Sequence, residues 1–341
     1  MPEFFPDIRG NAETRARFGR AVCDGTLSHA YILEGPEGSG KTLLATQIAA
    51  ALVCEKRGES DVLPCGVCNR CRRVLSGNAP DVKTVAVTTA TIGVDTIREL
   101  RADMYLSACE LPVKVYLIDD AHKMTPQAQN ALLKVLEEPP TDLVIFLLTE
   151  RSEALLSTIR SRTQLIRMEL LSPEQMTEAL GKNVAARRLR ESDPEAFRTL
   201  LEGSGGCLGQ AMILLDGKRG DAYRKRHNAV SEAVRSIVTH APYSTLVGIL
   251  GTLPTKRQEL TEELGMYLAA LRDLILIYRA GNCDLVFYPN RREAGELAAT
   301  AGFPRLLAAY DIVGRACDAL AANANISLTL QGLFGDLERL S

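Results

Sequence analysis

The chain has 341 residues, more than a single hydrophobic core usually organises, so two or three domains are expected. Hydrophobic residues make up 46% and charged residues 24%, as in a soluble globular protein, and the net charge of −2 argues against a protein that coats nucleic acid through bulk charge. No apolar run approaches the ~20 residues of a membrane span, and the N-terminus lacks a signal-peptide pattern. We therefore expect a cytoplasmic protein.

The first motif is a phosphate-binding loop. A helix is expected within residues 7–28 and an apolar strand at 30–33, and the next residues, 35–42, match G-x-x-x-x-G-K-[ST]. Glycines in such a loop let backbone N–H groups face phosphate oxygens, and the helix that begins near Lys41 directs its positive dipole end at the same charge. Lys41 would reach the β- and γ-phosphates and Thr42 the Mg²⁺. The predicted nucleotide-binding residues here are Gly35, Gly38, Ser39, Gly40, Lys41 and Thr42.

Four cysteines follow the helix of the phosphate loop, at Cys54, Cys65, Cys68 and Cys71. Four thiolates fill the tetrahedral shell of Zn²⁺, and two C-x-x-C steps let one backbone turn wrap the metal. Because a filled shell has no open position, the zinc site would be structural. Scattered buried cysteines or a redox pair are the alternatives. The remaining cysteines are expected in the core: Cys23, Cys109, Cys207, Cys283 and Cys317.

Strands and helices alternate over the next hundred residues. Apolar, β-branched runs predict strands at 81–87, 113–118, 143–148 and 164–168. Helices are expected between them at 94–109, 125–138 and 153–159, the second opened by Thr125-Pro126 and closed by Pro139-Pro140. This alternation predicts a parallel sheet. We therefore expect an α/β nucleotide-binding domain over residues 1–168, with the zinc module inserted at 54–71.

Two carboxylates, Asp119 and Asp120, directly follow the strand at 113–118. At the carboxyl end of a parallel strand, Asp119 would lie beside the phosphate loop and hold Mg²⁺ through water. The alternative is a turn aspartate that caps the next segment.

After residue 168 the pattern is entirely helical. Segments near 173–181, 194–202 and 207–216 predict a small helical domain over residues 169–217. A hinge is expected at 217–220, and an all-α domain over 218–341 follows, with helices at 221–239, 255–280, 304–322 and 327–340. A basic cluster near the hinge is either a DNA-contacting patch or, as is more common, a solvated face: Lys218, Arg219, Arg224, Lys225 and Arg226.

Taken together, these motifs resemble the bacterial DNA polymerase III clamp-loader subunits, AAA+ proteins related to eukaryotic replication factor C. The resemblance extends in order over the whole chain. It rests on the segment 29–33 before the phosphate loop, the inserted cysteines, the block 130–140 that ends in Leu-Glu-Glu-Pro-Pro, Ser161-Arg162-Thr163, and 323–325. The length and the absence of a long tail resemble the delta prime type. A gamma/tau-type motor subunit, or a zinc-containing AAA+ module of another assembly, is the alternative.

The resemblance implies a helical lid at 169–217 and a C-terminal collar at 218–341 that holds a ring together. It implies ATP, Mg²⁺ and Zn²⁺ as cofactors. The implied partners are gamma/tau and delta subunits in a hetero-oligomeric ring, with the sliding clamp and primer–template DNA reached through the complex. By the same resemblance, Thr149 would be the sensor beside the γ-phosphate and Arg162 an arginine finger acting in trans. From the residues alone, Arg162 is an ordinary surface arginine.

Three departures from the family pattern are visible. The family's Ser-Arg-Cys is Ser-Arg-Thr here, which retains Arg162. Asp120 stands where an ATPase has a glutamate to orient water, and its side chain is one methylene shorter. The segment 205–210 has no second-sensor arginine. We therefore expect this chain to bind ATP and to hydrolyse it weakly or not at all.

Overall fold

The structure is a computed structural model that describes residues 2–85, 91–239, 251–281 and 290–340, together with residues 242, 248, 285, 287 and 288. Contacts divide the chain into two compact units. The first comprises Met1–Ala179 and Gly206–Gln210, and the second Leu180–Gly205 and Ala211–Ser341. The finer division into three domains stays a prediction.

The first unit is built on a five-stranded parallel sheet with the strand order β4-β5-β6-β2-β7. Its strands are β2 (Ala30–Glu34), β4 (Val82–Val85), β5 (Lys114–Ile118), β6 (Leu143–Thr149) and β7 (Gln164–Arg167). Ile32 of β2 lies opposite Leu147 of β6 on one side and Leu165 of β7 on the other. Every residue of β5 and β6 is buried, as expected where helices cover both faces of a parallel sheet. The predicted parallel α/β fold is confirmed; residues 86–87 of the predicted strand 81–87 lie outside the described residues.

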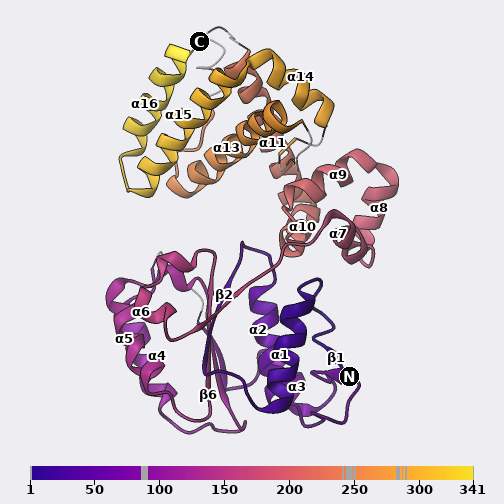
Figure 1. Ribbon diagram of the computed structural model, residues 1–341, viewed down its shortest axis with the longest axis vertical. Coiled ribbons are helices and arrows are strands. Elements are labelled where there is room, and N and C mark those ends of the chain that lie inside the picture. The colour runs from indigo at the N-terminus through magenta and orange to yellow at the C-terminus, as the bar shows by residue number, and fades with distance from the viewer. Residues whose placement is uncertain are drawn as a thin grey trace. The chain divides into compact units, whose positions relative to one another are not determined.

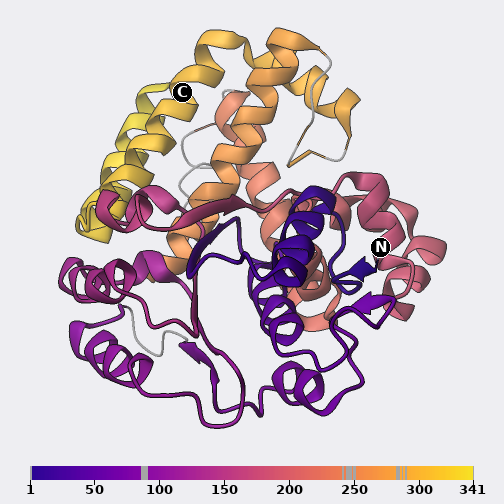
Figure 2. The same ribbon diagram turned by 60° about the horizontal axis from the view of Figure 1, so that its bottom comes forward.

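Helices cover the sheet on both faces, as Figure 1 and Figure 2 show. One face is covered by α1 (Ala12–Asp24), α2 (Lys41–Leu52) and α3 (Asn69–Leu75), and the other by α4 (Val94–Met104), α5 (Pro126–Glu137) and α6 (Ser157–Arg160). Side chains of β2 alternate between these two layers: Tyr31 and Leu33 pack toward α1 and α2, and Ala30 and Ile32 toward α4 and α5. The period of two in a strand thus places one apolar set on each side. The unpredicted pair β1 (Glu3–Phe4) and β3 (Val62–Leu63) forms a separate two-stranded sheet.

Side-chain hydrogen bonds to backbone N–H groups explain where α5 begins and where α4 ends. The Thr125 side chain accepts a hydrogen bond from the Ala128 N–H (3.2 Å), and Pro126 occupies the first turn of α5, as predicted. In contrast, α4 ends at Met104, five residues before the predicted end. The buried Asp81 carboxylate accepts the N–H groups of Cys109, Glu110 and Leu111 at 2.7, 2.8 and 2.9 Å, so these amides bond to Asp81 and not along a helix.

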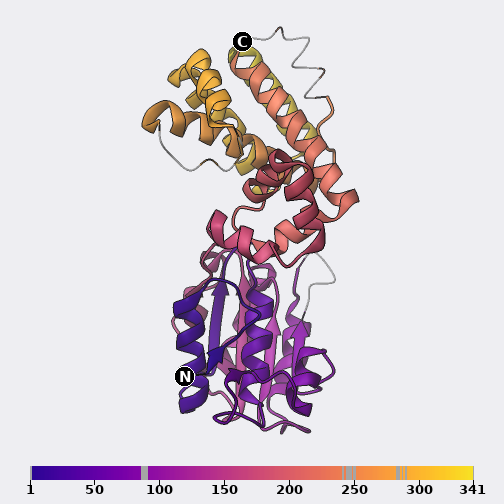
Figure 3. The same cartoon turned by 90° about the vertical axis from the view of Figure 1, so that its right-hand side faces the viewer.

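In its described residues the second unit contains helices and no β-strands. Its helices are α8 (Val184–Ser192), α9 (Pro194–Gly203), α11 (Gly217–Val238), α13 (Arg257–Ala280), α14 (Arg291–Ala301), α15 (Phe303–Ala321) and α16 (Ile326–Leu340). Apolar residues of α11 and α13 to α16 form one core, among them Val234, Leu271, Leu297, Val313 and Leu337. Figure 3 shows α11 as one long continuous helix. Two further helices, α7 (Pro173–Leu180) and α10 (Leu208–Leu215), contain the boundaries between the units.

The predicted hinge at 217–220 is wrong in its local structure, because these residues form the first turn of α11. The break between α10 and α11 falls at Asp216, whose carbonyl accepts the Gly220 N–H (2.7 Å). A Cβ atom at Gly220 would lie 2.0 Å from the Leu214 carbonyl oxygen. The glycine there permits close contact between α10 and α11, and does not mark a flexible joint.

The expected burial of the remaining cysteines needs correction. Cys23 and Cys109 are exposed and not in the core, whereas Cys207 is buried and Cys317 half-buried; Cys283 lies outside the described residues.

Within the described part of the chain, none of the helices has the length and apolar character needed to cross a membrane. The cytoplasmic location stays a prediction.

Candidate nucleotide-binding site and cysteine cluster

The phosphate loop, residues 35–40, joins β2 to α2 at the carboxyl edge of the sheet. β2 lies between β6 and β7, where the strand order reverses, and ligands of open parallel sheets bind at such a switch point. Gly38 and Gly40 have φ angles of +78° and +92°, in the left-handed region that favours glycine. The Gly35 N–H donates to the Thr149 carbonyl (3.0 Å), which ties the loop to the end of β6.

Lys41 is folded into this loop and is only 9% exposed. Its Nζ donates to the carbonyls of Gly35 (2.6 Å) and Pro36 (2.9 Å). Burial lowers the pKa of the Lys41 ammonium, and the nearby carboxylates of Glu150 and Asp119 counteract that effect. The loop therefore surrounds a buried cation.

Ser39 provides an independent test of whether the loop fits a nucleotide. Its hydroxyl oxygen is buried and has no hydrogen-bond partner among the described residues. Buried polar atoms are nearly always paired in folded proteins, so an unpaired hydroxyl in the same loop as a buried ammonium fits the phosphates of a nucleotide. Thr42 is exposed in the first turn of α2, directly after Lys41.

The two aspartates after β5 lie in different environments. Asp119 is half-buried, and its Oδ1 accepts the Asp120 N–H (3.0 Å). Asp120 adopts a left-handed φ of +48°, and its Oδ2 accepts a bond from Lys123 Nζ (2.7 Å). The Asp120 carboxylate is therefore engaged by a lysine on its own turn, whereas among the described residues no cation forms an ion pair with Asp119.

Thr149, at the end of β6, is 1% exposed. Its Oγ1 lies 3.3 Å from His122 Nδ1 and donates to the Arg151 carbonyl (3.1 Å). Burial lowers the pKa of His122, against the opposing effect of the Asp120 and Glu150 carboxylates. His122 and Glu150 were missed from the sequence, although each lies within four residues of the end of a strand at this edge.

Arg162 lies just after α6 and is held by its own subunit. Its guanidinium forms an ion pair with Glu137 Oε1 (2.8 Å) and donates to the Thr158 carbonyl (3.0 Å) and to Ser161 Oγ (3.3 Å). The side chain remains 36% exposed. Arg162 is thus positioned by contacts within the chain while part of it faces outward.

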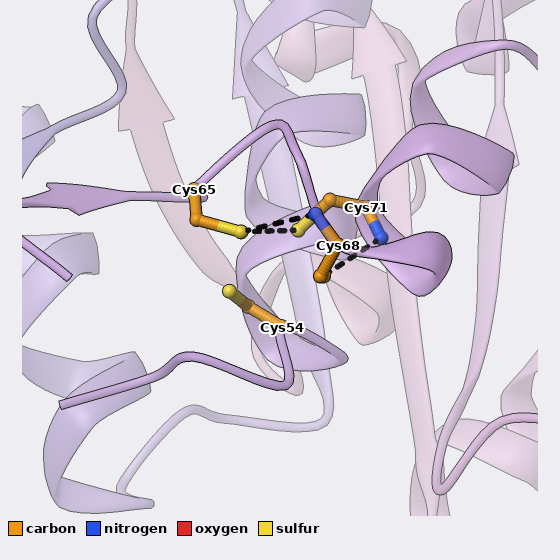
Figure 4. A group of neighbouring side chains, drawn as sticks. All are labelled: Cys54, Cys65, Cys68 and Cys71. Carbon is orange, nitrogen blue, oxygen red and sulfur yellow. Dashed lines mark hydrogen bonds between the residues drawn. The ribbon is translucent and has the colours of Figure 1, made fainter. Parts of the chain in front are cut away.

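The four clustered cysteines come together as Figure 4 shows, with their sulfurs directed at one another. Cys54 follows α2, Cys68 is the N-cap of α3, Cys71 lies in the first turn of α3, and Cys65 precedes them. All four Sγ atoms lie within 4.8 Å of one another, and the Cys65 and Cys71 sulfurs are 4.0 Å apart. Sulfurs around one tetrahedral Zn²⁺ with Zn–S bonds of about 2.3 Å are roughly 3.8 Å apart.

Backbone groups favour the thiolate form at Cys65, whereas burial raises the pKa of Cys54 and of Cys71. The Cys68 N–H donates to Cys65 Sγ (3.5 Å) and the Cys71 N–H to Cys68 Sγ (3.4 Å). Burial raises the pKa of Cys65, but the N–H groups of Cys68 and Val67 outweigh it and lower the pKa to about 7. The cysteines are free, so the donor set fits zinc, and zinc binding stays a prediction.

Comparison with known proteins relates this sequence to DNA polymerase III subunits. A family model described as "DNA polymerase III, delta subunit" matches residues 10–172. The gamma/tau subunit of Mycobacterium tuberculosis (strain H37Rv) is 31% identical over 252 residues, which cover 73% of this chain and 40% of that protein. The tau subunit of Escherichia coli is 32% identical over 215 residues, 63% of this chain and 33% of that protein. The chain belongs to the bacterial DNA polymerase III clamp-loader subunits of the AAA+ family.

The predicted clamp-loader family is therefore confirmed. This clamp-loader chain spans about 40% or less of the length of these two relatives. Because the two relatives are gamma/tau and tau subunits, the delta prime type stays a proposal. A gamma subunit-related protein from Thermotoga maritima is 17% identical, with a TM-score of 0.40, over 96% of this chain and 99% of that chain.

Proposed function

We propose that the chain is a clamp-loader subunit that binds MgATP and works in a hetero-oligomeric ring, which uses ATP to load a sliding clamp onto primed DNA. The observation that supports nucleotide binding is the phosphate loop itself, which contains a buried Lys41 and the unpaired hydroxyl of Ser39. Lys41 and the loop N–H groups would hold the β- and γ-phosphates, and Thr42 and Asp119 the Mg²⁺. When bound, ATP supplies the phosphoryl group whose transfer to water drives the cycle.

Within this family we favour the delta prime type, in which the chain's own hydrolysis is weak. Orienting a water needs a carboxylate at the right reach, and Asp120 is short and already bonded to Lys123 at 2.7 Å. The start of α10 contacts the phosphate loop through Gly209 and supplies no arginine there. Two groups that would stabilise the transition state are thus missing from this site.

The contribution of this subunit to catalysis would then be Arg162, acting on the nucleotide of a neighbouring subunit. A rigid guanidinium held by Glu137 and partly exposed suits a finger that stabilises charge on a transferring phosphoryl group. Such fingers increase rates by on the order of 10³–10⁵. In this proposal residues 169–217 form the lid and residues 218–341 the collar of the ring.

A gamma/tau-type motor subunit is the second candidate. The phosphate-loop motif is complete, and the relatives compared above are gamma/tau and tau subunits. The two candidates differ in one measurable property, because a motor subunit hydrolyses ATP with its own site. The similarity to DNA polymerase III subunits argues against the third alternative, a zinc-containing AAA+ module of another assembly.

We also propose that Cys54, Cys65, Cys68 and Cys71 hold one structural Zn²⁺. The support is the mutual approach of four sulfurs within 4.8 Å, three of them on buried residues. The metal would connect the end of α2 to the start of α3 and fix the inserted module.

Reconstitution tests the proposed function. The chain is mixed with candidate gamma/tau and delta subunits, and clamp- and DNA-stimulated ATPase is measured with and without it. We expect the chain to join the complex, to raise its stimulated ATPase, and to turn over little ATP alone. Failure to co-assemble contradicts the clamp-loader role, and rapid turnover by the isolated chain favours the motor subunit.

A further inference from the structure

A short segment, Gly206–Gln210, is docked on the first unit and belongs to it, although the residues on both sides belong to the second. We call this segment the glycine strap. Its two ends make backbone hydrogen bonds to the first unit. The Gly206 carbonyl accepts the Leu171 N–H (2.9 Å), and the Gly209 N–H donates to the Gly38 carbonyl in the phosphate loop (3.0 Å).

At both ends the strap contacts backbone so closely that no side chain fits. A Cβ atom at Gly209 would lie 2.7 Å from Gly38 Cα and 2.9 Å from its carbonyl oxygen. In the reverse direction, a Cβ at Gly38 would lie 2.6 Å from the Gln210 nitrogen. At the other end, a Cβ at Gly206 would lie 2.7 Å from the Leu171 carbonyl oxygen. Since these neighbours are backbone atoms, a side chain there would displace the strap, the loop or both.

Between its two ends the strap lies close to the charged Lys41 side chain of the phosphate loop. Cys207 is 4% exposed. Burial raises the pKa of its thiol, and the charge of Lys41 partly opposes that rise. The strap is thus packed near the same lysine that would bind the β- and γ-phosphates.

We propose that Gly209 is a positioning residue of the nucleotide site: its backbone contact with Gly38 holds the phosphate loop in the shape in which the loop N–H groups receive phosphate. This inference rests on the proposed nucleotide binding. The start of α10 lies too close to the loop for a side chain at position 209, so an arginine placed there would displace the loop.

Gly209→Ala in the full-length chain tests the proposal, with Gly217→Ala as the matched control. A Cβ at Gly217 meets no atom within 4 Å, so this control adds the same methyl group without a clash. The first measurement is amide hydrogen exchange of peptides that cover residues 35–40, without nucleotide. The second is titration with a fluorescent ATP analogue. We expect Gly209→Ala to speed exchange of the loop and to weaken ATP binding by about tenfold or more, and Gly217→Ala to change neither.

Unchanged loop exchange or unchanged affinity in a folded Gly209→Ala protein overturns the proposal. Circular dichroism establishes folding. If Gly209→Ala does not fold, Gly206→Ala releases the other end of the strap, and faster exchange of residues 35–40 is expected for it too; no increase overturns the proposal. A wild-type chain that binds no ATP analogue contradicts the proposed nucleotide function instead, and hydrogen exchange alone then decides whether Gly209 holds the loop.

Discussion

Replacing Cys71 with serine removes one of four predicted zinc ligands, at the most buried position of the cluster. Cys71 is 0% exposed, and its sulfur lies 3.5 Å from the Ala50 carbonyl of α2. A serine there leaves three thiols, an incomplete shell for a structural zinc. We therefore expect Cys71→Ser to lose the metal and to destabilise the first unit.

The size of the effect follows from the burial and from the metal. A buried hydroxyl with poor hydrogen bonding costs about 1–3 kcal/mol. Structural zinc contributes on the order of 10 kcal/mol in small zinc domains, and only part of that is lost here because α2 and α3 also pack on the core of the sheet. A loss of at least about 3 kcal/mol is expected, which lowers the Tm by about 6–12 °C for a unit of this size.

Metal analysis and calorimetry test this prediction. The wild-type chain should contain one zinc per chain, and Cys71→Ser much less. Cys23→Ser is the control, because Cys23 is an exposed cysteine of the same unit; it should retain the zinc and the wild-type Tm. The reasoning is refuted by a folded wild-type chain without zinc, or by equal Tm values for Cys71→Ser and Cys23→Ser.

Three other changes have defined outcomes. Lys41→Ala should abolish binding of a fluorescent ATP analogue. The control variant Lys56→Ala, which changes an exposed lysine, should bind the analogue normally. Burial raises the pKa of Asp81, but three backbone N–H groups outweigh burial and lower the pKa overall. The ionised carboxylate therefore stabilises the fold at neutral pH, and this stabilisation is lost as pH falls below about 4. Asp81→Asn should therefore reduce the unfolding free energy at pH 7 and flatten its decline toward pH 3 in chemical denaturation; an unchanged slope contradicts this. Glu137→Gln should lower kcat of the assembled complex about two- to fivefold with KM unchanged, and equal loss in the control Glu138→Gln would refute a specific role.

Local patterns in the sequence were sufficient for the sheet and its loop. Apolar strands, a glycine loop and a Thr-Pro cap are each encoded in a few adjacent residues, and β2, β5, β6 and α5 occur where they were predicted. The early end of α4 was not predictable in this way, because it depends on Asp81, which binds amides 28 to 30 residues further along the chain.

Each of the other errors has its own cause. Glycines at 217–220 suggested a hinge, yet Gly220 is required by contact with the Leu214 carbonyl. The missed helix α8 is short, rich in arginine and low in overall hydrophobicity. Its cap Asn183 was a usable signal, because the Asn183 side chain accepts the Ala186 N–H. Strand β1 has two residues, too few for any periodicity.

Within the candidate site, residue types were predictable and contacts were not. The phosphate loop, Asp119 and the cysteine spacing are visible as motifs. The ion pair between Arg162 and Glu137, and the backbone contact between Gly209 and Gly38, join segments that are far apart in sequence. Only the fold brings these groups together.

The most direct test of the central claim is the ATPase of the reconstituted complex with Arg162→Ala in place of the wild-type chain. Arg160→Ala is the matched control, an exposed arginine two residues away on α6. We predict that Arg162→Ala slows clamp- and DNA-stimulated turnover, by up to the order of 10³ at the site that the arginine serves, while ATP-analogue binding by the isolated chain is unchanged. Equal stimulated turnover in complexes with Arg162→Ala, Arg160→Ala and wild-type chains would contradict the account.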